Sequence, residues 1–542
     1  MAHGAAKSRP PQGRSTGTPR PTTDAAFRAA LALAQSGDAP GALAQLEALH
    51  SSDARHTGVR NALGVLRLES GDSAGAIAIL RPLAREHPDA AAIGLNLGNA
   101  LVAAGRGADA IAPLKRAVSR DPQSAIVCYG LARALQIAGR ADEAISAYER
   151  VLQLQPGHVD ARASLAAALN FVDRYADAER EARAVIAALP NASPLSAGAH
   201  FNLAVSLLAR AQWAEGWAEY EWRERTALLD GGRRSWTQPR WEGESLAGRT
   251  VLVHAEQGFG DTLQFVRYLP LLRERGAHVV LQCPAPLVEL LRHSTLADRV
   301  ISFADVLPAH DLQVPLTGLP HRLRLHSDRD VMLHDAPYLQ AVAGRDTIDA
   351  GWAAAPSPRV GLVWAGSPTH VNDMHRSCGL GALSPLLRTA GVTWVSLQTG
   401  DRARDLASVC EARLVHDHAP ALHDFAATAA AIRALDLVIT VDSAVAHLAG
   451  ALGTPCWLLL PRVGQDWRWA AEEHARSHAE PGAAALAQAR WYASVRTFRQ
   501  RSAGSWTDVV TDMASALASV LASASAATPA SVSGISPISP VR

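Results

Sequence analysis

The chain has 542 residues, with 52 basic and 51 acidic side chains and a formal net charge of +1. A chain of this length exceeds what a single hydrophobic core supports, so two or three domains are expected. Its balanced charge gives no general attraction to nucleic acid or to an anionic membrane, so neither is expected as a partner.

Residues 1–22 form a basic arm rich in Pro, Gly and Thr and without an apolar centre, which predicts disorder rather than a signal peptide. Residues 524–542 are expected to be a low-complexity tail. No stretch approaches the roughly 20 apolar residues that span a bilayer, so no transmembrane segment is expected. The five cysteines form no C-x-x-C pair, which is typical of a reducing compartment. We therefore expect a cytoplasmic protein.

An offset of 34 residues aligns small residues and prolines along residues 23–226. A small residue lets two helices cross closely, and a proline ends the second helix of each pair. The aligned residues are Ala42, Ala76, Ala110, Ala144, Ala178, Pro88, Pro122, Pro156 and Pro190. This period resembles the tetratricopeptide repeat, with about six units, the sixth carrying Gly216 at the alanine position.

A stack of such repeats exposes a concave face that commonly holds a peptide or protein. We expect this face to recruit a protein or glycan acceptor. The alternative is that the array serves assembly, as a homo-oligomer interface or a spacer. Nothing in the array resembles an active site, so any chemistry is expected beyond it.

After a bridge at 227–248, apolar runs alternate with helical segments. Such runs predict parallel strands covered by helices on both faces. They fall into two series, which predict two Rossmann-like lobes at 249–345 and 357–523 with a cleft between them. The expected fold is α + α/β. The predicted strands are 250–255, 278–283, 299–303, 311–316, 360–366, 392–398, 413–417, 435–442 and 455–461.

Two turns lie where ligands bind in this architecture, beyond the carboxyl ends of strands and at helix N-termini. HAEQGFGD occupies residues 254–261 in the first lobe, and TVDSAVAH occupies 440–447 in the second.

Together with VGLVWAGSPTHVNDMHRS and VSLQTG, these runs resemble the glycosyltransferase family 9 proteins, which are heptosyltransferase-like enzymes. More closely, the chain resembles bacterial proteins that fuse tetratricopeptide repeats to such a domain. The resemblance covers about residues 245–510. It implies a GT-B fold with an acceptor-side first lobe and a nucleotide-sugar-side second lobe. It also implies an inverting transfer from a nucleotide-diphosphate sugar, often an ADP-sugar, without a metal or cofactor.

The resemblance assigns Asp261 as the general base that accepts the proton of the acceptor hydroxyl. A hydroxyl is a weak nucleophile until its proton is taken, and such a base contributes about 10² to 10⁴ in rate. The alternative is that Asp261 only caps the following helix, and the two roles are compatible. Gly258 and Gly260 would give the turn its backbone freedom and leave room for substrate. His254, Glu256 and Gln257 would orient the acceptor or bond to turn amides.

In the second lobe the resemblance assigns the turn at Asp442, Ser443 and Ala444 to the donor, because a helix N-terminus attracts a diphosphate. It places Asp442 or His447 near the sugar or phosphate. The alternative is a serine N-cap followed by a satisfied histidine.

Arg376 aligns with the basic residue that the family uses against the donor phosphates, where an arginine fork suits phosphate oxygens. Gly366 and Ser367 are expected to contact phosphate, and Gln398 the nucleoside. Relatives continue after the Arg-Ser pair with an apolar residue and proline, whereas this chain has Cys378 and Gly379, a departure that would loosen the loop.

Two patterns suggest metal sites and are set aside. Asp328 and Asp330 form a D-x-D motif outside both turns, and His416 and His418 lack further ligands. The competing function is a non-catalytic repeat scaffold whose transferase half is degenerate and only binds partners or a nucleotide.

Overall fold

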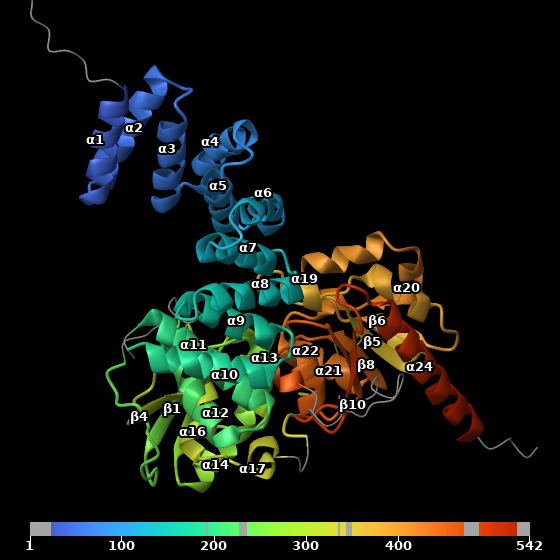
Figure 1. Cartoon of the computed structure of the whole chain (residues 1–542). Helices are drawn as coiled ribbons and strands as arrows, with labels where there is room; N and C mark the ends of the chain where they lie inside the picture. Colours follow the sequence, from blue (N-terminus) through green and yellow to red (C-terminus); the bar gives the residue numbers. More distant parts are fainter. Residues whose placement is uncertain are drawn as a thin grey trace, which may run out of the picture. The chain divides into compact units, whose positions relative to one another are not determined.

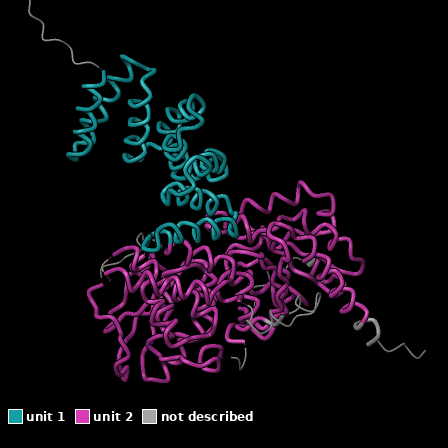
Figure 2. The backbone as a smooth tube through the Cα atoms, viewed as in Figure 1, with its two compact units in different colours: residues 1–161 teal, residues 162–542 magenta. Residues whose placement is uncertain are grey.

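The computed structural model describes residues 23–190, 193–226, 236–333, 337–342, 350–470 and 487–527. The chain divides into two compact units, residues 1–161 and 162–542 (Figure 2). The expected arm at 1–22, much of the bridge and the end of the expected tail lie outside the described residues.

The first unit consists of antiparallel helix pairs at the predicted period (blue to teal in Figure 1). Its aligned alanines are fully buried where paired helices cross. A Cβ on Gly64 would lie 2.5 Å from Leu80, which explains the glycine at this crossing. The helices are α1 (Thr23–Gln35), α2 (Ala39–Ser52), α3 (Thr57–Glu69), α4 (Ser73–Glu86), α5 (Ala91–Ala103), α6 (Gly107–Arg120), α7 (Ala125–Ile137), α8 (Ala141–Leu154) and the start of α9 (Val159–Phe171).

The second unit begins with the last repeats and continues into the α/β half. Ala178 and Gly216 keep the repeat pattern here, since Ala178 is fully buried and a Cβ on Gly216 would lie 2.8 Å from Leu208. The repeat helices end in a short 3₁₀ segment. These elements are α10 (Tyr175–Ala188), α11 (Pro194–Ala209), α12 (Trp213–Tyr220) and η1 (Glu221–Arg225).

The α/β half contains two sheets (Figure 1). The first has the strand order β3-β2-β1-β4 and is parallel throughout, as predicted. Its strands are β1 (Thr250–His254), β2 (His278–Cys283), β3 (Arg299–Ser302) and β4 (Leu312–Pro315). The helical segments around it are α13 (Phe259–Phe265), η3 (Val266–Tyr268), α14 (Leu269–Glu274), α15 (Ala285–His293), η4 (Leu316–Gly318), α16 (Leu319–Leu323) and α17 (Asp328–Met332).

The second sheet has the order β10-β11-β9-β8-β5-β6-β7 and is parallel except for the β10–β11 pair. Its strands are β5 (Arg359–Val363), β6 (Thr393–Ser396), β7 (Val415–Asp417), β8 (Leu437–Val441), β9 (Cys456–Leu460), β10 (Ala487–Gln488) and β11 (Val495–Arg499). The helical segments are α18 (Ala350–Ala353), α19 (Asp373–Arg376), α20 (Leu380–Leu387), η5 (Asp401–Ala407), η6 (Cys410–Leu414), η7 (Ala419–Ala421), α21 (Phe425–Arg433), α22 (Ala444–Ala451), η8 (Trp467–Trp469) and α24 (Thr507–Ala527).

The nine predicted strands all form, because strands buried on both faces read as continuous apolar runs. The chain is thus a helical repeat array followed by parallel α/β sheets.

Candidate functional site

The turn after β1 leads directly into α13, and Asp261 lies in the first turn of that helix. Its Oδ2 accepts a hydrogen bond from the Gly258 N–H at 3.0 Å, so Asp261 does cap the helix. Its Oδ1 accepts a second bond, at 2.6 Å, from Nη2 of Arg468 in the second lobe. Burial raises the pKa of Asp261 above its ordinary value, and the charge of Arg468 opposes that rise.

The two turns meet at Gly260. A Cβ on this residue would lie 2.8 Å from Cδ2 of His447 and 3.7 Å from Cα of Ala444. The glycine is therefore needed for the close approach of α13 to α22, rather than for an unusual backbone angle. The expectation that the turns of the two lobes come together agrees with this packing.

His447 lies in the core between the turns, with 6% of its surface exposed. Its Nδ1 is 3.0 Å from the Tyr492 hydroxyl, and its ring packs against Trp469. Burial lowers the pKa of His447 to about 3, so the imidazole is neutral. This is the satisfied histidine of the alternative interpretation, not a side chain directed at open space.

The N-terminus of α22 follows Asp442 and Ser443. Ser443 does not cap the helix through its side chain, and its Oγ lies 3.0 Å from Oγ1 of Thr440 instead. Asp442 accepts a hydrogen bond from the Trp469 indole at 2.8 Å. Burial, and then the nearby Asp466, raise the pKa of Asp442 to about 6.

A loop at 466–469 links both turns, because Arg468 bonds to Asp261 while its neighbour Trp469 bonds to Asp442. Asp466 holds Arg468 through both of its carboxylate oxygens, at 2.9 and 3.0 Å. Sequence reasoning missed Arg468 and Asp466. The available signal was QDWRWA, whose tryptophans suggested packing alone.

Arg376 is mostly buried beside Gly366, where a Cβ would lie 2.6 Å from its guanidinium. Its Nε is 3.5 Å from an oxygen of Asp373 and has no hydrogen-bond acceptor among the described residues. The positive charge of Arg376 opposes the rise in the pKa of Asp442.

The other residues assigned to the donor differ in their contacts. The Gln398 side-chain oxygen accepts from the backbone N–H groups of Trp364 and Ala365, and its amide nitrogen donates to the Thr399 carbonyl. Bonded in this way, the buried Gln398 ties the end of β5 to the end of β6. The expected contact of Gln398 with a nucleoside stays a prediction. Ser367 is exposed, and the Gly366 N–H donates to the Ser377 hydroxyl.

The loop at Cys378 and Gly379 is held rather than loosened. Both backbone N–H groups donate to the Trp364 carbonyl, at 2.9 and 3.3 Å. Gly379 has φ of +70°, a conformation that favours glycine.

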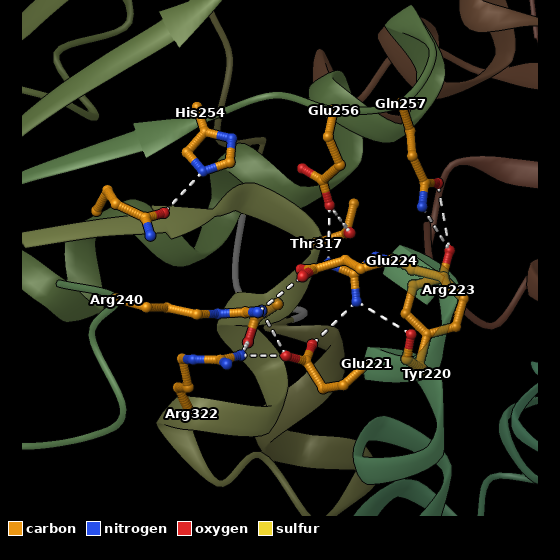
Figure 3. Close-up of polar contacts among 12 residues, drawn as sticks. Tyr220, Glu221, Arg223, Glu224, Arg240, His254, Glu256, Gln257, Thr317 and Arg322 are labelled. Carbon is orange, nitrogen blue, oxygen red and sulfur yellow. Dashed lines mark hydrogen bonds and ion pairs between the residues drawn. The ribbon is translucent and has the colours of Figure 1, made fainter. Parts of the chain in front are cut away.

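The residues at the mouth of β1 contact neighbouring segments instead of turn amides (Figure 3). Glu256 accepts from Arg223 at 2.9 Å and also from Thr317. The Gln257 amide and the Tyr220 hydroxyl bond at 3.0 Å. Since Tyr220 and Arg223 close the last repeat, this repeat directly supports the turn that carries Asp261.

His254, at the end of β1, has its Nε2 3.0 Å from Oε1 of Gln313, and its ring stacks on Trp236. We expected His254, Glu256 and Gln257 either to orient an acceptor or to bond to turn amides. The contacts with Gln313, Arg223, Thr317 and Tyr220 were not among these alternatives.

A buried ion cluster anchors the end of the repeats to the first sheet (Figure 3). Arg223 is 1% exposed and lies between Glu221 and Glu256, each at 2.9 Å. Arg240 and Arg322 also bind Glu221, at 2.6 and 2.5 Å. Burial opposes the charged form of Glu221, but the three arginines outweigh it and lower its pKa to about 2.

The last repeats also contact α13 and the loop from β9 to η8. Trp217 packs edge-on against Phe265 of α13 and against Trp467 beside Arg468. The Gly464 N–H donates to the Phe171 carbonyl at the end of α9, at 2.6 Å. Repeat helices therefore pack against both halves of the candidate site.

The residues set aside as metal ligands have other partners. Asp328 accepts from the Trp213 indole at 2.7 Å, and His418 from the Trp352 indole at 3.3 Å. Among the described residues, no group of three or more His, Cys, Asp or Glu side chains has the arrangement of a metal site. Away from these residues, a cavity of about 490 Å³ lies along the edge strand β3 and is lined by residues that include Arg292 and Val306.

Residues 61–125 and 135–200 match two family models, both described as tetratricopeptide repeat. The curated protein FlbA of Caulobacter vibrioides is 29% identical over 342 residues, which is 58% of this chain. This span exceeds the repeats, so the likeness continues into the α/β half. The chain covers only 54% of the length of FlbA, about half.

Several solved repeat proteins are similar to part of the chain. TTC0263 of Thermus thermophilus is 19% identical, with a TM-score of 0.29, and the match covers 34% of this chain and 99% of that protein. YrrB, described as a repeat protein with an unusual peptide-binding site, is also 19% identical with a TM-score of 0.29, over 32% of this chain and 88% of its own. In the part of the chain that the structure describes, no helix has the length and apolar character needed to cross a membrane. The N-terminal region of this chain is built of tetratricopeptide repeats.

Proposed function

We propose that the chain is a glycosyltransferase that moves a sugar from a nucleotide-diphosphate sugar, such as an ADP-sugar, to a hydroxyl of a protein or glycan acceptor. The proposal rests on the resemblance of residues 245–510 to glycosyltransferase family 9. The observation that supports it best is the meeting of the two strand-end turns, where Gly260, the neighbour of Asp261, packs against the first turn of α22 and Arg468 of the second lobe binds the Asp261 carboxylate.

In the proposed reaction, Asp261 accepts the proton of the acceptor hydroxyl as its oxygen attacks the anomeric carbon. The bond from that carbon to the diphosphate breaks on the opposite face, which inverts the configuration. The departing diphosphate takes the bonding electrons and is stabilised by Arg376 and by the N–H groups at the start of α22. No step calls for a metal.

The repeats supply the recruiting surface in this proposal. Repeat stacks commonly hold peptides or proteins on their concave face. Contacts of Tyr220 and Arg223 with the turn at 256–257 support a close connection between recruitment and chemistry.

The test is transfer or donor hydrolysis by the purified chain across a panel of nucleotide sugars. D261N should reduce turnover by about 10² or more, the contribution of a general base. R376Q should weaken nucleoside-diphosphate binding in a thermal-shift assay, which needs no acceptor. D401N is the control, because Asp401 is highly exposed and lies in the same lobe as Arg376.

Equal turnover in D261N and in the unchanged chain would remove Asp261 from the mechanism. An absence of turnover and of nucleotide binding with every donor would favour the alternative function, a repeat scaffold with a degenerate transferase half.

A further inference from the structure

Arg468 is the one side chain described above that holds the Asp261 carboxylate from the opposite lobe. Each nitrogen of its guanidinium has a different acceptor residue: Nε donates to Gln264 at 2.5 Å, Nη1 to Asp466 and Nη2 to Asp261 at 2.6 Å. Its side chain is 4% exposed. We propose, on the basis of the function proposed above, that Arg468 is a positioning residue that orients the Asp261 carboxylate and keeps it ionised.

The orientation follows from which oxygens are held. Arg468 binds Oδ1 of Asp261, and the Gly258 N–H binds Oδ2 from the other side. Rotating the carboxylate would break one of these two bonds. Each oxygen keeps a second acceptor site, and the Asp261 side chain is 23% exposed. The held carboxylate can therefore still accept a proton from a hydroxyl.

The ionisation follows from the charges that face Asp261. Burial favours its neutral form, and only Arg468 among its close charged neighbours is both cationic and hydrogen-bonded to it. Without this cation the nearest charges would be the carboxylates of Asp466 and Glu256, which act with burial to favour the protonated form of Asp261. The titratable and charged groups that face Asp261 are Arg468 and Asp466 from the 466–469 loop, Glu256 from its own turn, Tyr220 from α12 and His370 from the loop after β5.

Arg468 is itself fixed, so it can act as a rigid reference. Both oxygens of Asp466 bind Nη1, and the rings of Trp467 and Phe265 lie 4.6 and 5.5 Å from the guanidinium carbon. A lysine at this position would carry one ammonium on a flexible stem, and it could not serve three separated acceptors at once. Replacing Arg468 by lysine therefore keeps the positive charge near Asp261 but removes the fixed set of three hydrogen bonds.

The first measurement needs no turnover. The pH at which Asp261 titrates is obtained from the difference in unfolding free energy between a protein and its D261N variant across pH 4 to 8. In the R468Q background this midpoint should rise by at least about 1 pH unit, a tenfold increase in proton affinity. R267K is the control, because Arg267 is equally buried but bonds to backbone carbonyls and Tyr338.

If R468Q does not fold, R468K replaces it, with an expected rise of at least about 0.5 unit because the lysine reaches fewer acceptors. In transfer assays R468K should lower kcat about tenfold or more, leave the donor KM unchanged and move the acid limb of the pH profile upward. A midpoint within roughly 0.3 unit of the unchanged chain, the smallest shift that such a titration resolves, would overturn the proposal, as would an equal shift in R267K. If the chain turned over no donor, the proposed function would be refuted. The titration midpoint of Asp261 would still test the role of Arg468, because it requires no turnover.

Discussion

Gly260→Ala tests whether the two lobes meet through the turns as the structure indicates. The added methyl carbon would lie 2.8 Å from Cδ2 and 3.3 Å from Nε2 of His447. Side chains in a native core do not approach so closely, so either the His447 ring or one of the two helices must shift. The backbone angles of Gly260 need no glycine, because its φ is not positive.

The magnitude depends on whether His447 can move. It is 6% exposed, bonded to the Tyr492 hydroxyl and packed against Trp469. Inserting a methyl group into such packing costs about 1–3 kcal/mol, and the gain from replacing a helical glycine by alanine offsets up to about 1 kcal/mol of it. We expect G260A to lose about 1–2 kcal/mol of unfolding free energy.

The assay is urea unfolding, with G381A as the matched control. Gly381 is also the second residue of its helix, α20, but has nothing within 4 Å of its added Cβ. G381A should therefore be neutral or stabilising, and G260A in an H447A background should cost nothing further. A G260A protein as stable as the unchanged chain, with the same m-value, would refute the close approach of α13 and α22.

Three further predictions follow from the buried groups. H447N should reduce the dependence of the unfolding free energy on pH by up to about 1.4 kcal/mol per pH unit at mildly acidic pH. The pKa of His447 in the folded chain, about 3, lies below the ordinary value of 6.5, so the stability due to the neutral imidazole is complete above pH 6.5 and is lost as the pH falls. Unfolding measured from pH 7 to 4 tests this slope. E256Q should lower the unfolding free energy by about 1–3 kcal/mol in chemical unfolding, because it weakens the bond to buried Arg223. E242Q, at a 64% exposed carboxylate, should lower it by less than about 0.5 kcal/mol. Equal losses in the two variants would contradict the burial argument. A fragment of residues 236–542 should be at least about 3 kcal/mol less stable than one of 162–542, since burial of a tryptophan such as Trp217 alone contributes about 3–5 kcal/mol, and calorimetry showing equal stability would argue against a supporting role for the last repeats.

The regular elements of the fold were predictable from the sequence, because repeats and buried strands carry local periodic patterns. Strand β11 (Val495–Arg499) was missed, since the two arginines and the threonine of VRTFR interrupt any continuous apolar run. Its parallel pairing with β9 depends on the tertiary structure, which places it beside an already buried strand.

The site was predictable only in part. The position of Asp261 after a strand and a glycine turn pointed to a strand-end site, but its partner Arg468 is 207 residues away and follows no local pattern. Glu256 and Gln257 find their partners 33 and 37 residues earlier, in the repeats. His447 was assigned to the donor, whereas contacts with Tyr492 and Trp469 enclose it. Long-range packing decided these cases.

The anchoring of Tyr220 and Arg223 onto the β1 turn has a practical consequence for protein engineering. A graft of foreign repeats onto this chain would have to retain the native repeat helices of the second unit, from residue 162 through η1. A junction in the bridge at 227–248 would leave the buried carboxylate of Glu256 without its arginine, whereas a junction near residue 161 would follow the natural boundary between the compact units.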